Sequence, residues 1–191
     1  MKKTLVTIVS AIALLVLASV AMAAGTATIQ VQASIPTSNA LNVSINKIVG
    51  SVWTPATVVD FGALVLDPAF GVFRPSDGGY YVVDVGVNSN APAWTVTHTV
   101  TPMTNGTANL DNKINVTFMN QGATTGTELA KLSYAASNSR VIANTDLSAG
   151  SWLRIYYGIA GGSGDATGVT PITTSQPGGS YAGTITLTLA P

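Results

Sequence analysis

Apolar and polar residues alternate along most of this chain with a period of two, which is the pattern of strands that bury one face. The segments 41–45, 81–87, 94–100, 114–118 and 153–159 all show it. In the clearest case, at the C-terminus, one register holds Tyr181, Gly183, Ile185, Leu187 and Leu189, and the other holds Ala182, Thr184, Thr186 and Thr188. With about eight to ten short strands and no helical period, the pattern predicts an all-β, Greek-key β-sandwich.

Several connections are open to two interpretations. The segments 81–87 and 94–100 flank a turn at 88–92, so they form either a hairpin or a crossing from one sheet to the other. Residues 129–142 suit either short strands or one helical turn. The loops around residues 62–80 and 160–178 either cross between sheets or carry a binding function.

A second terminal strand is predicted near the N-terminus. Its polar positions are Thr28, Gln30, Gln32 and Ser34, and its apolar positions are Ala27, Ile29, Val31, Ala33 and Ile35. Pro36 ends it, because proline has no amide hydrogen for a sheet. A strand of this kind completes either its own sheet or that of a neighbouring molecule.

The first 23 residues have the features of a secretory signal peptide. Met1, Lys2 and Lys3 precede an apolar run from Leu5 to Val20, and 21–23 match a small-x-small cleavage site. We therefore predict cleavage after Ala23, a single β-sandwich domain over 24–191, and no membrane span after cleavage. The protein is expected to be secreted, in the periplasm, at the cell surface or outside the cell.

Charge and cysteine content narrow the function. Without Lys2 and Lys3 the chain keeps six basic and eight acidic residues, so it offers no basic patch for nucleic acid. It has no cysteine, which excludes disulfides, thiolate metal sites and cysteine nucleophiles. Its stability must come from packing and from hydrogen bonds within the sheets.

The residue pattern gives little support for an enzymatic function. The single histidine, His98, shares a register with Val96 and Val100, so we expect a packed, hydrogen-bonded core residue. The eight carboxylates are scattered and mostly lie beside turn residues. Asp165, in a glycine-rich loop, is the one candidate calcium ligand, but its spacing matches no calcium loop. We predict no catalytic residues, no cofactor and no metal site.

A surface for a ligand or partner is predicted around residues 152–156. Trp152, Arg154 and Tyr156 share one strand face, opposite Leu153 and Ile155. Aromatic side chains on an exposed sheet face can stack on sugars, whereas the same pattern also occurs where both faces of a strand are buried. The remaining candidates for such a surface are Trp53, Trp94, Tyr80 and Tyr181.

The strand sequences resemble secreted β-sandwich proteins of bacterial surfaces. The segments 60–62, 85–91 with Trp94-Thr95-Val96, and 179–189 are similar to WxL-domain proteins and to pilin subunits of the chaperone–usher and spore-coat-U type. Val96 stands in place of the leucine of the first WxL motif, and Leu187 in place of the tryptophan of the second. The pilin resemblance implies an immunoglobulin-like fold completed by a donor strand, and the segment from Ala27 to Ile35 would be that donor.

These observations predict a secreted, non-enzymatic structural or adhesive protein of the cell surface. Its partners would be copies of itself or other surface subunits, joined by strand exchange in a pilus, fibre or coat. The alternative is a carbohydrate- or cell-wall-binding module that uses aromatic residues near Trp152 and Tyr156.

Overall fold

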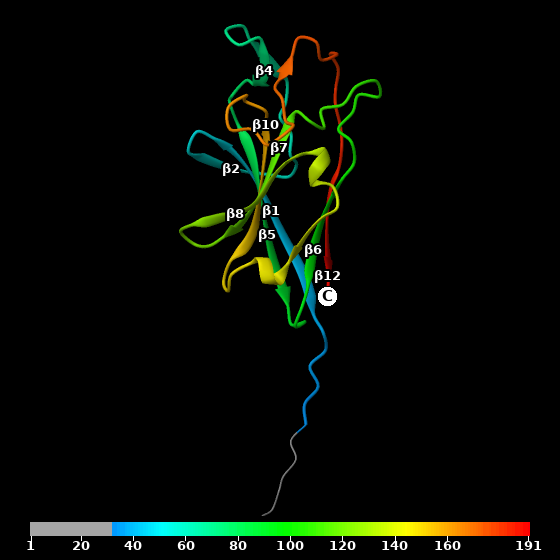
Figure 1. Cartoon of the computed structure of the whole chain (residues 1–191). Helices are drawn as coiled ribbons and strands as arrows, with labels where there is room; N and C mark the ends of the chain where they lie inside the picture. Colours follow the sequence, from blue (N-terminus) through cyan, green and yellow to red (C-terminus); the bar gives the residue numbers. More distant parts are fainter. Residues whose placement is uncertain (1–31) are drawn as a thin grey trace, which may run out of the picture. The chain divides into compact units, whose positions relative to one another are not determined.

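Antiparallel β-sheets are the main regular structure in the computed structural model, which describes residues 32–191 (Figure 1). Thr37–Pro191 form one compact unit. The elements along the described chain are β1 (Asn39–Val49), β2 (Val52–Ala56), β3 (Leu64–Asp67), β4 (Val72–Pro75), β5 (Tyr80–Ser89), β6 (Thr95–Val100), β7 (Ile114–Gln121), β8 (Gly126–Ser133), η1 (Ala135–Ser137), β9 (Arg140–Ala143), η2 (Asn144–Asp146), β10 (Trp152–Ile159), β11 (Ile172–Thr173) and β12 (Ile185–Ala190). The all-β prediction is confirmed.

Three sheets organise these strands. The largest has the order β2-β1-β5-β10-β7-β8, and a smaller one has the order β12-β6-β9. β5 and β6 lie in different sheets, so the turn between them is a crossing rather than a hairpin. The ambiguous region 129–142 contains the end of β8, the single 3₁₀ turn η1 and most of β9.

The third sheet, with the order β11-β4-β3, is built from the two loops whose role the sequence left open. Residues 62–80 form the β3–β4 hairpin, and Ile172 in the 160–178 region pairs with Phe73 of β4. Two segments about one hundred residues apart in the chain are therefore joined by strand pairing. Such pairing depends on long-range contacts that a local pattern does not encode.

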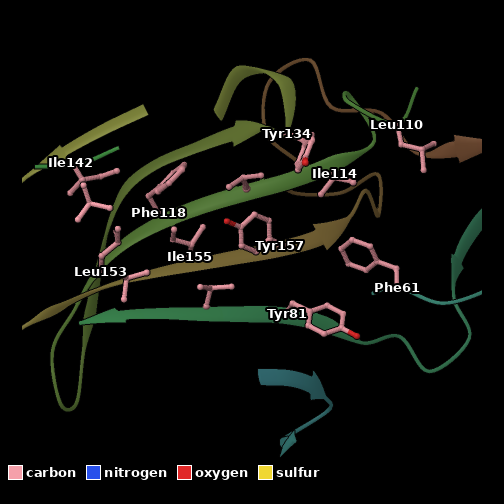
Figure 2. Close-up of a cluster of buried hydrophobic side chains, with 14 of the residues drawn as sticks. Phe61, Tyr81, Leu110, Ile114, Phe118, Tyr134, Ile142, Leu153, Ile155 and Tyr157 are labelled. Carbon is pink, nitrogen blue, oxygen red and sulfur yellow. The ribbon is translucent and has the colours of Figure 1, made fainter. Parts of the chain in front are cut away.

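The core lies between the inner face of the six-stranded sheet and the inner face of the β12-β6-β9 sheet. Strands β5, β7 and β10 supply alternating inward residues, among them Val83, Phe118 and Ile155, and β6 and β9 supply Val96 and Ile142 (Figure 2). Figure 2 shows Phe118, Ile155 and Ile142 within this core, with Leu110 and Phe61 at one end. The inward register on each strand agrees with the period-two pattern.

The C-terminal strand is shorter than predicted. β12 begins at Ile185 instead of Tyr181, because strand pairing is reduced at Ala182 to an isolated bridge with Thr104. At Gly183 the neighbouring backbone comes so close that a Cβ atom would lie 2.9 Å from the Thr101 carbonyl oxygen. The predicted facing is correct for Ile185, Leu187 and Leu189, which pack against the core.

The predicted N-terminal strand falls mostly outside the described residues, which do not include Ala27, Ile29 and Val31. Its described end, Gln32–Ile35, has no strand assignment, and Ile35 is 83% exposed.

His98 is a buried core residue, as its register predicts. The side chain is fully buried on β6 and packs edge-to-face on Phe118, with ring centroids 5.2 Å apart. Nδ1 lies 2.9 Å from the Ser137 carbonyl oxygen, which can only accept, so Nδ1 carries the hydrogen. Nε2 then accepts a hydrogen bond from the Tyr157 hydroxyl at 2.9 Å. The ring is held in one neutral tautomer.

Acidification is expected to destabilise the fold through His98. Burial lowers its pKa below the ordinary 6.5, although its hydrogen bond with Ser137 acts in the opposite direction. Above pH 6.5 the ring is neutral in both the folded and the unfolded state. Below that pH, His98 binds a proton more readily in the unfolded chain than in the folded protein, because its pKa is lower when folded. The free energy of unfolding therefore falls by up to about 1.4 kcal/mol per pH unit.

Urea unfolding of the wild type and of His98→Gln, measured at several pH values between 7.5 and 5, checks this expectation. Glutamine keeps a donor and an acceptor but does not titrate in this range, so the variant retains only the contribution of the carboxylates. Equal slopes of stability against pH in the two proteins would contradict the assignment.

Candidate functional site

The predicted surface around residues 152–156 lies on the outer face of the six-stranded sheet. Trp152, Arg154 and Tyr156 are partly exposed, whereas the alternating residues Leu153 and Ile155 are buried in the core. The structure therefore places all three residues on one face, as the strand pattern predicts. The face is partly exposed. The two interpretations of the sequence were an exposed ligand surface and a strand buried on both faces, and the structure lies between them.

An ion pair fixes the centre of this face. Asp84 of β5 is the cross-strand neighbour of Arg154, whose Nε and Nη2 donate to the two carboxylate oxygens at 2.6 and 2.8 Å. The indole Nε1 of Trp152 donates to the same carboxylate at 3.0 Å. The hydrogen bond with Asp84 raises the pKa of Arg154, while partial burial opposes that effect. The sequence showed Asp84 only as one scattered carboxylate.

Aromatic side chains surround the ion pair. The guanidinium of Arg154 lies over the rings of Trp53 and Trp152, at 5.0 and 5.7 Å from their centroids. Tyr156 contacts Tyr80, with ring centroids 6.1 Å apart. We call Trp53, Tyr80, Trp152 and Tyr156 the outer aromatic face. The other two candidates from the sequence, Trp94 and Tyr181, instead pack against the core between the sheets.

The outer aromatic face has an apolar base of its own. Ile48 and Val82 are buried, yet neither belongs to the core between the sheets. Ile48 is the cross-strand neighbour of Trp53 and Tyr80, and Val82 is the neighbour of Tyr156. Close packing against these buried residues restricts the conformations of the neighbouring aromatic side chains.

A hollow of about 320 Å³ adjoins the ion pair on the same face. Its lining comes from β1, β5 and β10, and consists of Asn42, Val43, Ser44, Asp84, Gly86 and Trp152. Gly86 has no side chain, and an added Cβ atom there would meet nothing closer than 3.9 Å. The hollow therefore exists because Gly86, among Asn42 and Ser44, has no side chain to fill the space.

A second feature is a row of apolar side chains along β1 and β12, on the inner side of the sandwich. Residues 37–191 cover this row only in part. These two strands approach one another but are not paired. Their inward residues remain partly exposed, although Val43, Ile45, Leu187 and Leu189 are cross-strand neighbours of buried residues. We call this row the open seam; it consists of Leu41, Val43 and Ile45 from β1 and Ile185, Leu187 and Leu189 from β12.

The contrast with the adjacent strands defines the seam. Val43 is 47% exposed, whereas its neighbour Val85 on β5 is buried. Leu187 is half-buried, whereas its neighbour His98 on β6 is fully buried. Within residues 37–191, β12 pairs only with β6, and the Asn39–Ser44 part of β1 pairs only with β5. The seam thus combines apolar side chains with two unpaired strand edges.

A larger cavity of about 580 Å³ lies beside the small sheet of β3, β4 and β11. Apolar residues of its lining include Phe61, Leu64, Phe73 and Ile172. Tyr181 reaches it from the C-terminal region, where its hydroxyl accepts from Gln176 and donates to the Pro177 carbonyl oxygen. The side chains of Gln176 and Tyr181 are thus engaged with each other.

The candidate calcium ligand Asp165 is committed to its own loop. Its carboxylate accepts hydrogen bonds from the Gly161 and Gly162 amides and from the Asn115 side chain. Burial alone would raise the pKa of Asp165, but these hydrogen bonds outweigh it and lower the pKa below the ordinary value. Between residues 32 and 191, no three His, Asp or Glu side chains gather in a way that could hold a metal ion.

Two further findings bear on the class of this protein. The part that the structure describes contains no helix long and apolar enough to cross a membrane. No protein-family model, curated protein or solved structure matches this chain.

Proposed function

We propose that this chain is a secreted structural subunit of the cell surface that assembles by strand exchange. In this proposal the signal peptide 1–23 is removed, and the N-terminal segment from Ala27 to Ile35 of one copy pairs with the open seam of the next. The fold would then be an immunoglobulin-like Greek-key sandwich completed by a donated strand, as the resemblance to pilin subunits implies. The protein has no catalytic role in this proposal.

The open seam is the observation that carries the proposal. It presents apolar residues at every second position on both β1 and β12, and each strand has a free edge beside it within residues 37–191. A strand placed there would gain backbone hydrogen bonds and would bury apolar side chains at the same time. Burial of apolar surface stabilises by about 25 cal/mol per Å².

The donor segment matches the seam in pattern and in length. Ile29, Val31 and Ile35 alternate with polar residues, so one face of the segment suits an apolar groove. Its nine residues span roughly 30 Å as a strand, whereas the six residues of β12 span roughly 20 Å. One donated segment is therefore long enough to cover the whole length of β12.

The test compares charges placed on opposite faces of the donor segment in the mature chain 24–191. Ile29→Glu combined with Val31→Glu puts two carboxylates on the apolar face and is expected to abolish polymers. Gln30→Glu combined with Gln32→Glu adds the same charge to the polar face and is expected to leave polymers intact. Electron microscopy and size-exclusion chromatography measure the outcome.

Polymers that persist with the apolar face charged would contradict strand exchange. A wild type that stays monomeric, and that loses thermal stability only in the Ile29→Glu/Val31→Glu variant, would show that the segment completes its own sheet. Equal effects of the two pairs of substitutions would show that the added charge controls assembly, rather than the apolar face of a donated strand.

A further inference from the structure

The hollow on the outer face is shallow and open to solvent, and it shares only Val43 with the open seam. We propose that it binds a neutral sugar ring of a glycan, with the ring stacked on Trp152 and its hydroxyls bonded to Asn42 and Ser44. At about 320 Å³ the hollow is at the lower end of the range for small-molecule pockets. That size suits one sugar unit rather than an extended peptide.

The aromatic wall is held in place before any ligand arrives. The hydrogen bond from Trp152 Nε1 to Asp84 fixes the indole, and Arg154 lies over the ring at 5.7 Å. The C–H groups on one face of a pyranose are apolar and pack against the negative face of an aromatic ring. A fixed ring loses little conformational entropy on binding, which favours affinity.

The polar groups of the hollow match sugar hydroxyls. Asn42 and Ser44 lie on β1 with no side-chain hydrogen bond to any residue that the structure describes. An amide and a hydroxyl both donate and accept, as each hydroxyl of a sugar does. The absence of a side chain at Gly86 leaves the space in which the ring would sit.

The charge of the site selects a neutral sugar. Asp84 is the one charged residue of the lining, and both of its oxygens already accept hydrogen bonds from Arg154. The guanidinium of Arg154 is likewise directed at Asp84, so no free cation in the hollow would pair with the carboxylate of a uronic or sialic acid. Acidic sugars would therefore gain no ion pair in the hollow.

Binding of a panel of neutral and acidic oligosaccharides to the mature chain tests the proposal, followed by titration calorimetry with the sugars that bind. Gly86→Val places a side chain in the hollow while Trp152 itself is unchanged, and it is expected to weaken binding about ten-fold or more. Gly158→Val is the matched control, because Gly158 lies on the same face but outside the hollow, with 3.8 Å to its nearest neighbour. Trp152→Phe should weaken binding less than Trp152→Ala. Thermal unfolding confirms that each variant is folded.

Binding of neutral sugars by the wild type, retained in Gly158→Val and lost in Gly86→Val, supports the proposal. It is overturned if no neutral sugar binds, if only acidic sugars bind, or if Gly86→Val binds as well as the wild type. Self-association that is lost in Gly86→Val would assign this face to a protein contact and would also overturn it. These experiments measure sugar binding, whereas the test of strand exchange measures polymer formation, so the two proposals can fail separately.

Discussion

Replacing Phe118 with alanine is expected to lower the free energy of unfolding by about 3–5 kcal/mol, the range for removing a buried aromatic ring. Phe118 is fully buried at the centre of β7, and its ring packs edge-to-face on His98 of the opposite sheet. The substitution therefore leaves a cavity between the sheets and removes an aromatic contact as well. For a chain of this size, the melting temperature should fall by roughly 10 °C.

Guanidinium unfolding at pH 7.5 measures the effect. Met119→Ala is the matched control, since Met119 is the next residue of β7 and its side chain is only partly buried on the opposite face. We expect Met119→Ala to cost clearly less than Phe118→Ala. Similar losses for the two variants would mean that the space between the two sheets is not the main core of the protein.

Replacing Asp84 with alanine is expected to cost about 1–3 kcal/mol of unfolding free energy, because it leaves the guanidinium of Arg154 without its partner. The two side chains retain 22% and 14% of their exposure, so water compensates part of the loss and the cost stays below that of a fully buried pair. Trp152 also loses the acceptor of its indole hydrogen bond.

A double-mutant cycle with Arg154→Met isolates the interaction between the two charges. The double variant should be more stable than the sum of the two single losses predicts, because it no longer contains an unpaired charge. Strictly additive losses would show that the ion pair contributes nothing beyond the separate side chains. In that case the position of Trp152 would depend on packing alone.

Local patterns were enough to predict most strands of the large sheet and which of their faces are buried. The alternation at β1, β5, β7 and β10 identified the inward residues correctly, because a sheet requires a period of two wherever one face is buried. The burial of His98 and the shared face of Trp152, Arg154 and Tyr156 follow from the same rule.

The partners of these residues could not be predicted in the same way. Asp84 and Arg154 are seventy residues apart in the chain, and Trp53 reaches the same cluster from the far side of β1. Which carboxylate meets which arginine depends on strand order, which is set by packing of whole sheets rather than by any short segment. The start of β12 at Ile185, beyond the isolated bridge at Ala182, likewise does not follow from the alternating pattern.

The sequence by itself therefore determined the β class, the buried face of the main strands and the weakly charged, cysteine-free character of the chain. Tertiary structure decided that the inward residues of β1 and β12 remain partly exposed, and that Gly86 lies beside Trp152 to form a hollow. The physical reason is that periodicity specifies which side of a strand is buried, whereas the arrangement of strands in space specifies what covers it.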